Sequence, residues 1–208
     1  MLGHGQSECE RPGLRAHGSK FHYFVDDTNE FLTAAKRSVL DKMFGALVAL
    51  NTILSGQHDF RGCIVGSPAI EVEYTLTLRM IELVSEPFGW MFPTARVVPG
   101  VSFHALTRDP DFYRDYMADP LNVTENLTLR MGMEVSYGMA QLQRHRDIQD
   151  EERTFCNVTL LALQGTEDKV TSVDCVQDFM QRIVNKGKEL KLSQESFIVS
   201  IMNPRSRR

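Results

Sequence analysis

The sequence lacks any apolar run of the roughly 18 residues that a helix needs to cross a bilayer. Residues 1–13 are polar and lack the apolar stretch of a secretory signal peptide. Basic residues (23) are fewer than acidic residues (27), and only residues 205–208 concentrate positive charge, so no nucleic-acid-binding surface is expected. These absences predict a cytoplasmic protein with no nucleic acid among its partners.

Cysteine is also sparse, and its spacing excludes two classes of small domain. The four cysteines lie far apart, with no C-x-x-C pair and no histidine at metal-ligand spacing: Cys9, Cys63, Cys156 and Cys175. This pattern argues against a zinc module and against a disulfide scaffold. We therefore expect reduced, buried thiols and no metal or other cofactor.

What is present fits one globular domain, because 42% of the 208 residues are hydrophobic and 24% are charged. Apolar residues recur at helical spacing over 19–40, and a second helix over 43–54 is apolar almost all round and stops at Ser55-Gly56. The short apolar run 61–66 is typical of a buried parallel strand. The strand that should precede the second helix is hard to identify.

Further along the chain, the residue composition changes over 69–153, and after it predicted strands and helices alternate again. Residues 69–153 hold most of the aromatic and methionine content and are broken by prolines into short helices and loops. A strand is predicted at 157–163, a helix from an N-cap at Ser172 to Gly187, and a last strand at 189–192. The fold class is therefore α/β, a parallel sheet with flanking helices and a helical insertion.

Four separated stretches carry a resemblance to a known family: Gly3-His4-Gly5-Gln6-Ser7-Glu8, Phe24-Val25-Asp26-Asp27, the stretch from Met43-Phe44-Gly45-Ala46 to Ile64-Val65-Gly66-Ser67-Pro68, and Leu161-Ala-Leu-Gln-Gly165-Thr-Glu-Asp168-Lys-Val170. In this order they resemble the monoacylglycerol-lipase-like α/β-hydrolases, also grouped as the serine aminopeptidase S33 domain. Asp119-Pro120-Leu121 is similar to a motif in the cap of that family. The resemblance covers roughly residues 2–192 and is carried by the order of the motifs.

The resemblance implies a partial α/β-hydrolase fold whose core is 1–68 and 154–192, without the N-terminal strands. Residues 69–153 would form a helical cap or lid, and 193–208 an irregular tail. The implied activity is serine-dependent hydrolysis of carboxylic esters, and the resemblance points to monoglycerides among them. Asp168 would be the triad acid and the backbone N–H of Met43 an oxyanion donor. The implied partners are a small lipid ester or fatty acid, with peripheral membrane contact through the cap, and the oligomeric state stays open.

The sequence departs from the family at two of the three triad positions. It contains no G-x-S-x-G, and Lys42 stands where the family has its serine. The last histidine is His145, whereas the family's catalytic histidine follows the last strand. We therefore predict that this chain is inactive as it stands. With its N-terminal neighbours missing, the strand at 61–66 should also present an unpaired edge.

The remaining candidate residues have simpler interpretations. Lys42 is expected to be solvated, and Ser7, Ser67 and His4 to be structural loop residues. His17, His22, His58, His104 and His145 show no metal-ligand spacing. The sequons at Asn122, Asn126 and Asn157 are attributed to chance, the last because it opens a predicted buried strand.

Two alternatives to an ester hydrolase stay open. The first is a non-catalytic module in which the cap still binds an apolar ligand. The second is a truncated or mis-spliced gene product with a lost junction near Asp41 and an intron-derived tail from about Ser193.

Overall fold

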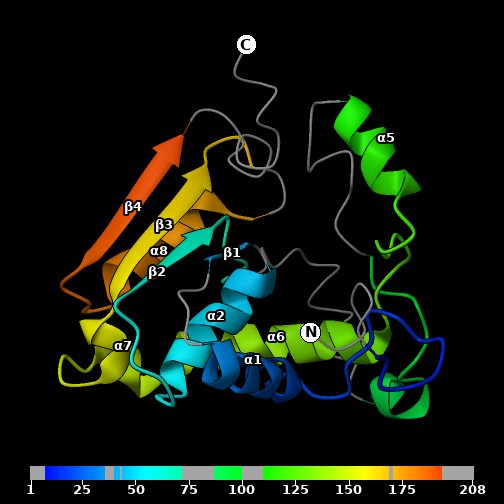
Figure 1. Ribbon diagram of the computed structural model, residues 1–208, viewed down its shortest axis with the longest axis horizontal. Helices are drawn as coiled ribbons and strands as arrows, with labels where there is room; N and C mark the ends of the chain where they lie inside the picture. Colours follow the sequence, from blue (N-terminus) through cyan, green and yellow to red (C-terminus); the bar gives the residue numbers. More distant parts are fainter. Residues whose placement is uncertain are drawn as a thin grey trace.

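The computed structural model describes residues 8–35, 40–42, 44–71, 87–99, 110–168 and 171–193. Within these ranges, four strands form one parallel sheet in the order β1-β2-β3-β4 (Figure 1): Leu40–Lys42, Gly62–Gly66, Thr159–Gly165 and Lys188–Ser193. A parallel sheet with flanking helices is the predicted fold class, which is confirmed.

The sequence predicts only three of these strands, and β1 is the one that it misses. Residues Leu40–Lys42 pair in parallel with Ile64–Gly66 of β2. The expectation that β2 has no neighbour on this side is therefore wrong over Ile64–Gly66. A strand of three residues is too short to show an alternating or continuous apolar pattern, so its pairing could not be read from the sequence.

Two predicted boundaries at the C-terminal half are also corrected. The third strand begins at Thr159 and not at Asn157, because Thr154–Asn157 form the short helix α7. Asn157 is exposed and does not open a buried strand. Helix α8, Val173–Arg182, has Ser172 as its N-cap, as predicted, with the Ser172 side chain accepting a hydrogen bond from the Cys175 backbone N–H. It ends at Arg182, well before Gly187.

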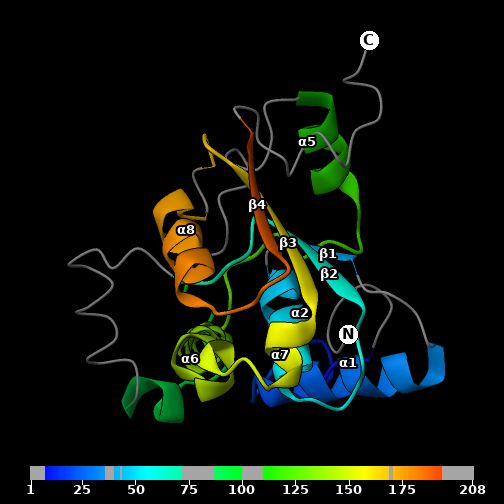
Figure 2. The ribbon, with the colours of Figure 1, turned by 90° about the vertical axis from the view of Figure 1, so that its left-hand side faces the viewer.

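The helices pack into one apolar core with a single face of the sheet. Cys63 and Val65 of β2 are buried, whereas Ile64, which points to the opposite face, is 41% exposed. Helix α8 lies on one side of the sheet when the sheet is seen edge-on (Figure 2). Two further helices complete the N-terminal part of the core: α1, His22–Ala35, and α2, Phe44–Leu54, which stops at Gly56 with its φ of +65°.

Two elements come from the stretch that the sequence assigns to the cap. Helix α5, Pro110–Ala118, is drawn apart from the sheet in Figure 1. Helix α6, Leu129–Arg144, instead contributes Met131, Met139 and Leu142 to the same core as α1 and α2. The 3-10 helix η1, Arg146–Gln149, follows it. The division into a core and a cap over 69–153 stays a prediction.

All four cysteines are free thiols, and only two of them are buried. Cys63 and Cys156 belong to the core, and burial raises the pKa of the Cys156 thiol. Cys9 and Cys175 are half-buried, so the expectation of burial is wrong for these two. In the described part of the chain, no helix is both long enough and apolar enough to cross a membrane.

Candidate active site

The carboxyl ends of the strands meet at one edge of the sheet because the strands are parallel. Gly66 at the end of β2 pairs with Leu163, and Gly165 at the end of β3 pairs with Ser193. The Ser67 backbone N–H donates to the Leu163 carbonyl at 2.8 Å. The carboxyl ends of β2, β3 and β4 therefore lie side by side, at the edge where open α/β sheets bind their ligands.

Asp168 lies in the loop after β3, and its carboxylate is held from two directions. Oδ1 accepts a hydrogen bond from the Thr171 backbone N–H at 3.0 Å, and Oδ2 accepts one from the Thr171 hydroxyl at 2.7 Å. Gln164 Nε2 adds a longer contact to Oδ2 at 3.4 Å. The orientation of the carboxylate is thus set by its own loop. An oriented carboxylate just past a strand end is what a catalytic triad needs to hold an imidazole.

Thr171 and Gln164 are the residues of this site that the sequence analysis missed. Thr171 is 4% exposed and Gln164 is fully buried, and Gln164 Nε2 also donates to the Thr171 hydroxyl at 3.1 Å. Two signals could have found them. Thr171 is three residues after Asp168, a spacing at which an aspartate often accepts a backbone hydrogen bond. Gln164 is a polar residue within a buried apolar strand, where it needs polar partners.

Ser67 is a loop residue at the end of β2, as predicted, but its backbone conformation and its burial are unusual for a loop serine. Its φ of 43° places it in the left-handed region, and its side chain is 1% exposed. Among the described residues, neither the Ser67 hydroxyl nor the amide oxygen of Gln164 has a hydrogen-bond partner. Strained backbone and unpaired buried polar atoms concentrate at functional sites. Both features lie at the same edge of the sheet as Asp168, although the described residues also include an unpaired buried Asn51 Oδ1 in α2 and a left-handed backbone at Ala16.

The backbone at the expected position of the nucleophile is present, although the residue is a lysine. Lys42 is the last residue of β1, opposite Gly66, and α2 begins at Phe44. A strand-to-helix turn is the setting in which α/β-hydrolases place their serine. Met43, with its predicted oxyanion N–H, lies outside the described residues, as do Ser7 and His4. These assignments stay predictions.

The four described histidines each have a partner outside the loop that carries Asp168. These pairs are His17 with Thr128 at 2.8 Å, His58 with the Asn29 carbonyl at 3.0 Å, His145 with the Asp147 backbone N–H at 3.3 Å, and His22 with the Tyr23 ring at 4.6 Å between centroids. His104 lies outside the described residues. In the ranges that the structure describes, no group of histidine, cysteine and acidic side chains could hold a metal ion.

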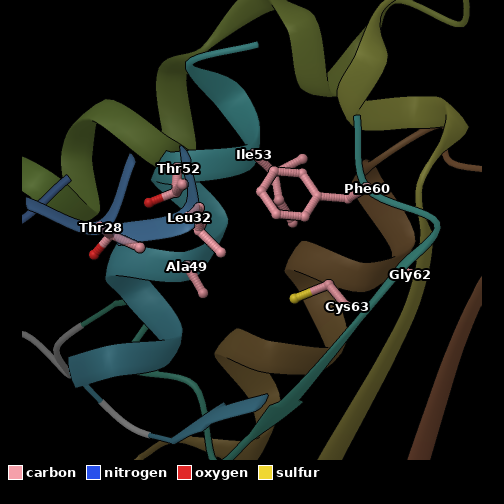
Figure 3. A pocket seen from close by; sticks show the side chains of 8 residues that line it. All are labelled: Thr28, Leu32, Ala49, Thr52, Ile53, Phe60, Gly62 and Cys63. Atoms are coloured by element: carbon pink, nitrogen blue, oxygen red, sulfur yellow. The ribbon is translucent and has the colours of Figure 1, made fainter. Parts of the chain in front are cut away.

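A small cavity lies between α1, α2 and β2, but its size excludes an acyl chain. Figure 3 shows the Cys63 thiol and the Phe60 ring among the side chains that line it. Its volume of about 10 Å³ is room for at most one water molecule. The cavity is therefore a packing defect of the core and not the predicted lipid pocket, whose cap residues lie in part outside the described ranges.

Comparisons with solved structures agree with this architecture. The monoacylglycerol lipase of Paleococcus ferrophilus superposes with a TM-score of 0.76 at 19% identity, over 93% of this chain and 70% of the lipase. A monoglyceride lipase from Saccharomyces cerevisiae, solved with a substrate analog, gives 0.68 at 18% identity, over 91% of this chain and 65% of that lipase. An esterase from Exiguobacterium antarcticum superposes with a TM-score of 0.64 at 16% identity, over 99% of this chain and 75% of the esterase. At these identities the likeness establishes the fold.

The family itself is established by a match along nearly the whole sequence. The chain covers only 65% of the yeast lipase, so it spans less than the full fold of that relative. Among curated proteins, none matches the sequence. The family model described as "Serine aminopeptidase, S33" matches residues 1–197. The chain therefore belongs to the serine aminopeptidase S33 family and has the α/β-hydrolase fold.

Proposed function

We propose that the fold of this chain is built for carboxylic esters of the monoglyceride type and that the chain itself binds such a ligand without hydrolysing it. The observation that supports an ester-type site is the carboxylate of Asp168, which Thr171 and Gln164 orient at the carboxyl edge of the sheet. The proposed lack of hydrolysis rests on the missing G-x-S-x-G and the absence of a histidine after His145. The likeness to two monoglyceride lipases supports the substrate class.

The proposed roles follow from acyl-transfer chemistry. A serine attacks the ester carbonyl, a histidine takes and returns the proton, and the acid orients the imidazole. Backbone N–H groups stabilise the oxyanion. By the family resemblance, Asp168 would be the acid and the Met43 N–H one oxyanion donor, whereas Lys42 stands at the serine position and no histidine follows His145. Because triad residues act as a unit, losing the serine or the histidine costs roughly 10⁶-fold in rate.

We expect the purified chain to show no labelling by a fluorophosphonate probe and no hydrolysis of monooleoylglycerol above the rate without protein. A non-hydrolysable ether analogue of the monoglyceride should nevertheless bind saturably in a calorimetric titration. The Asp168→Asn variant serves as the matched control for any trace activity, because a contaminating esterase would be unaffected by it. A labelled serine identified in a peptide of this chain would contradict the proposed inactivity, and absence of saturable binding would contradict the ligand-binding role.

We further propose that the cap contacts membranes through a cluster of exposed apolar side chains at 87–92. Trp90 is 79% exposed, Met91 70%, and Phe88 and Phe92 each 52%. Exposed aromatic and methionine side chains that are close together in the sequence suit insertion at the boundary between lipid headgroups and acyl chains. A lipid surface is also the place where a monoglyceride would be found.

The single tryptophan of the sequence provides a direct test of this contact. On adding phosphatidylcholine vesicles, we expect the fluorescence of Trp90 to shift to shorter wavelength, because the indole leaves water. In a flotation assay, the double variant Trp90→Ala, Phe92→Ala should lose roughly tenfold or more in vesicle binding, since each buried aromatic side chain contributes about 1.5–3 kcal/mol. Phe31→Ala, which removes a 65% exposed aromatic side chain from α1, is the control. An equal loss in that control, or no spectral shift, would refute the contact.

A further inference from the structure

Segment 8–21 is attached to the N-terminal end of α6 by a buried polar contact. His17 is 1% exposed and Thr128 is fully buried, and His17 Nδ1 lies 2.8 Å from the Thr128 hydroxyl oxygen. Thr128 is also the N-cap of α6, where its oxygen accepts a hydrogen bond from the Met131 backbone N–H at 3.3 Å. One hydroxyl therefore serves both the start of the helix and the attached segment.

The hydrogen bonds of this pair favour a neutral imidazole that is protonated at Nε2. The Thr128 oxygen already accepts from Met131, so its own proton needs an acceptor, and Nδ1 of a histidine protonated at Nε2 provides it. A second proton on the ring would make Nδ1 a donor as well. The hydroxyl proton would then lose its acceptor in a buried site, where an unpaired polar group is costly.

The charged groups around His17 also oppose a charged ring. Burial is the largest effect that lowers the pKa of His17, and Arg11 of the same segment, Arg96 of the stretch 87–99 and Arg130 of α6 act in the same direction. Glu10 is the group that opposes them, and its carboxylate already accepts a hydrogen bond from the Ser19 backbone N–H at 2.8 Å. At neutral pH the buried ring is therefore uncharged.

Further contacts of segment 8–21 with the 93–134 region join a side chain to a backbone group and involve no histidine. Arg130 Nε donates to the Ser19 carbonyl at 2.8 Å, and the Phe21 backbone N–H donates to Glu134 at 2.8 Å. Arg96 donates to the Arg15 carbonyl at 2.7 Å. Histidine is the side chain that ordinarily titrates between about pH 5 and 8.

We infer that His17 is a pH-sensitive latch: its neutral ring holds segment 8–21 against the N-terminus of α6, and its protonation releases the segment there. The ring is harder to protonate in the folded state than in the unfolded chain, so the unfolded chain binds more protons at mildly acidic pH. The latch is therefore fully effective above the ordinary histidine pKa of about 6.5 and weakens as the pH falls below it. The parallel sheet, which makes no use of this contact, keeps its structure.

The test is amide hydrogen exchange by NMR on the whole chain between about pH 7.5 and about pH 5.5, corrected for intrinsic rates. We expect the protection of the Phe21 and Met131 amides to fall by roughly tenfold or more at the acidic end, while amides of β3 keep theirs. In His17→Gln, which cannot titrate, protection should be independent of pH. His58→Gln, a change at a histidine outside the latch, should behave like the unchanged chain.

The result that would overturn the latch is protection of Phe21 and Met131 that is flat with pH in the unchanged chain, or pH dependence that survives in His17→Gln. If His17→Gln does not fold, the NMR signals of the histidine rings in the unchanged chain provide the test of the latch. The loss of protection must then follow the titration midpoint of His17 and not that of the exposed His22. A loss that follows another midpoint refutes the latch.

Discussion

Replacing Phe179 with alanine is expected to lower the free energy of unfolding by about 3–5 kcal/mol. Phe179 is 1% exposed and, with Val176 and Met180, forms the face of α8 that packs into the core. The change leaves a cavity that a helix held at both ends cannot close. Since α8 follows the loop of Asp168 directly, loosening the helix should also loosen that carboxylate. Urea denaturation followed by circular dichroism measures the change.

The control is Gln181→Ala on the same helix, because Gln181 is exposed. Surface changes of this kind usually stay within about 0.5 kcal/mol. A Phe179→Ala variant no less stable than Gln181→Ala would show that α8 is not packed on the sheet as the structure has it.

The second large effect is expected at Asn185, whose side chain joins α7 and the residue after it to the loop before β4. Its Nδ2 donates to the carbonyls of Phe155 at 3.0 Å and Val158 at 2.6 Å, and its Oδ1 accepts from the Gly187 backbone N–H at 2.8 Å. The residue is 3% exposed. Asn185→Ala leaves three polar groups without this partner, at about 1–3 kcal/mol for each group that stays buried and unsatisfied. We therefore expect a loss of about 3 kcal/mol in the same denaturation experiment.

Two further variants make this prediction specific. Asn157→Ala removes an exposed asparagine whose side chain also donates to a carbonyl, that of Arg153 at 3.2 Å, and should change stability by less than about 0.5 kcal/mol. Asn185→Asp keeps the acceptor for Gly187 but brings a carboxylate against two carbonyl oxygens, so it should be as damaging as alanine. Full stability of Asn185→Asp would contradict the assigned hydrogen bonds.

Much of the fold was predictable because its signals are local. The apolar pattern of α2, the glycine after it and the runs that became β2 and β3 follow from residue type and spacing over short stretches. Strand β1 could not be predicted in this way because its three residues are too few to show a pattern. The start of β3 was misplaced because Thr154–Asn157 form a helical turn beside it.

The candidate site was predictable only in part. The motif that ends in Asp168 is continuous in the sequence, so its place after a strand was correct. The contacts of its carboxylate with Thr171 and Gln164 were not predicted, although both residues are near in the sequence, because apolar periodicity carries no information on loop conformation. The left-handed backbone of Ser67 was missed for the same reason. The contact of His17 was missed because its partner, Thr128, is more than a hundred residues away in the chain.

The sequence by itself predicted a parallel α/β protein with Asp168 just after the strand at 157–163, and it contains no G-x-S-x-G and no histidine after His145. The sequence has no long apolar run, no closely spaced cysteine pair and little concentrated positive charge. These features argued against a membrane-spanning protein, a disulfide or zinc module and a nucleic-acid-binding protein. Only the tertiary structure decided which distant polar groups meet: Asn185 with the carbonyls of Phe155 and Val158, and His17 with Thr128, the N-cap of α6. The reason is physical, since helices and strands follow from neighbours along the chain, whereas buried hydrogen bonds follow from neighbours in space.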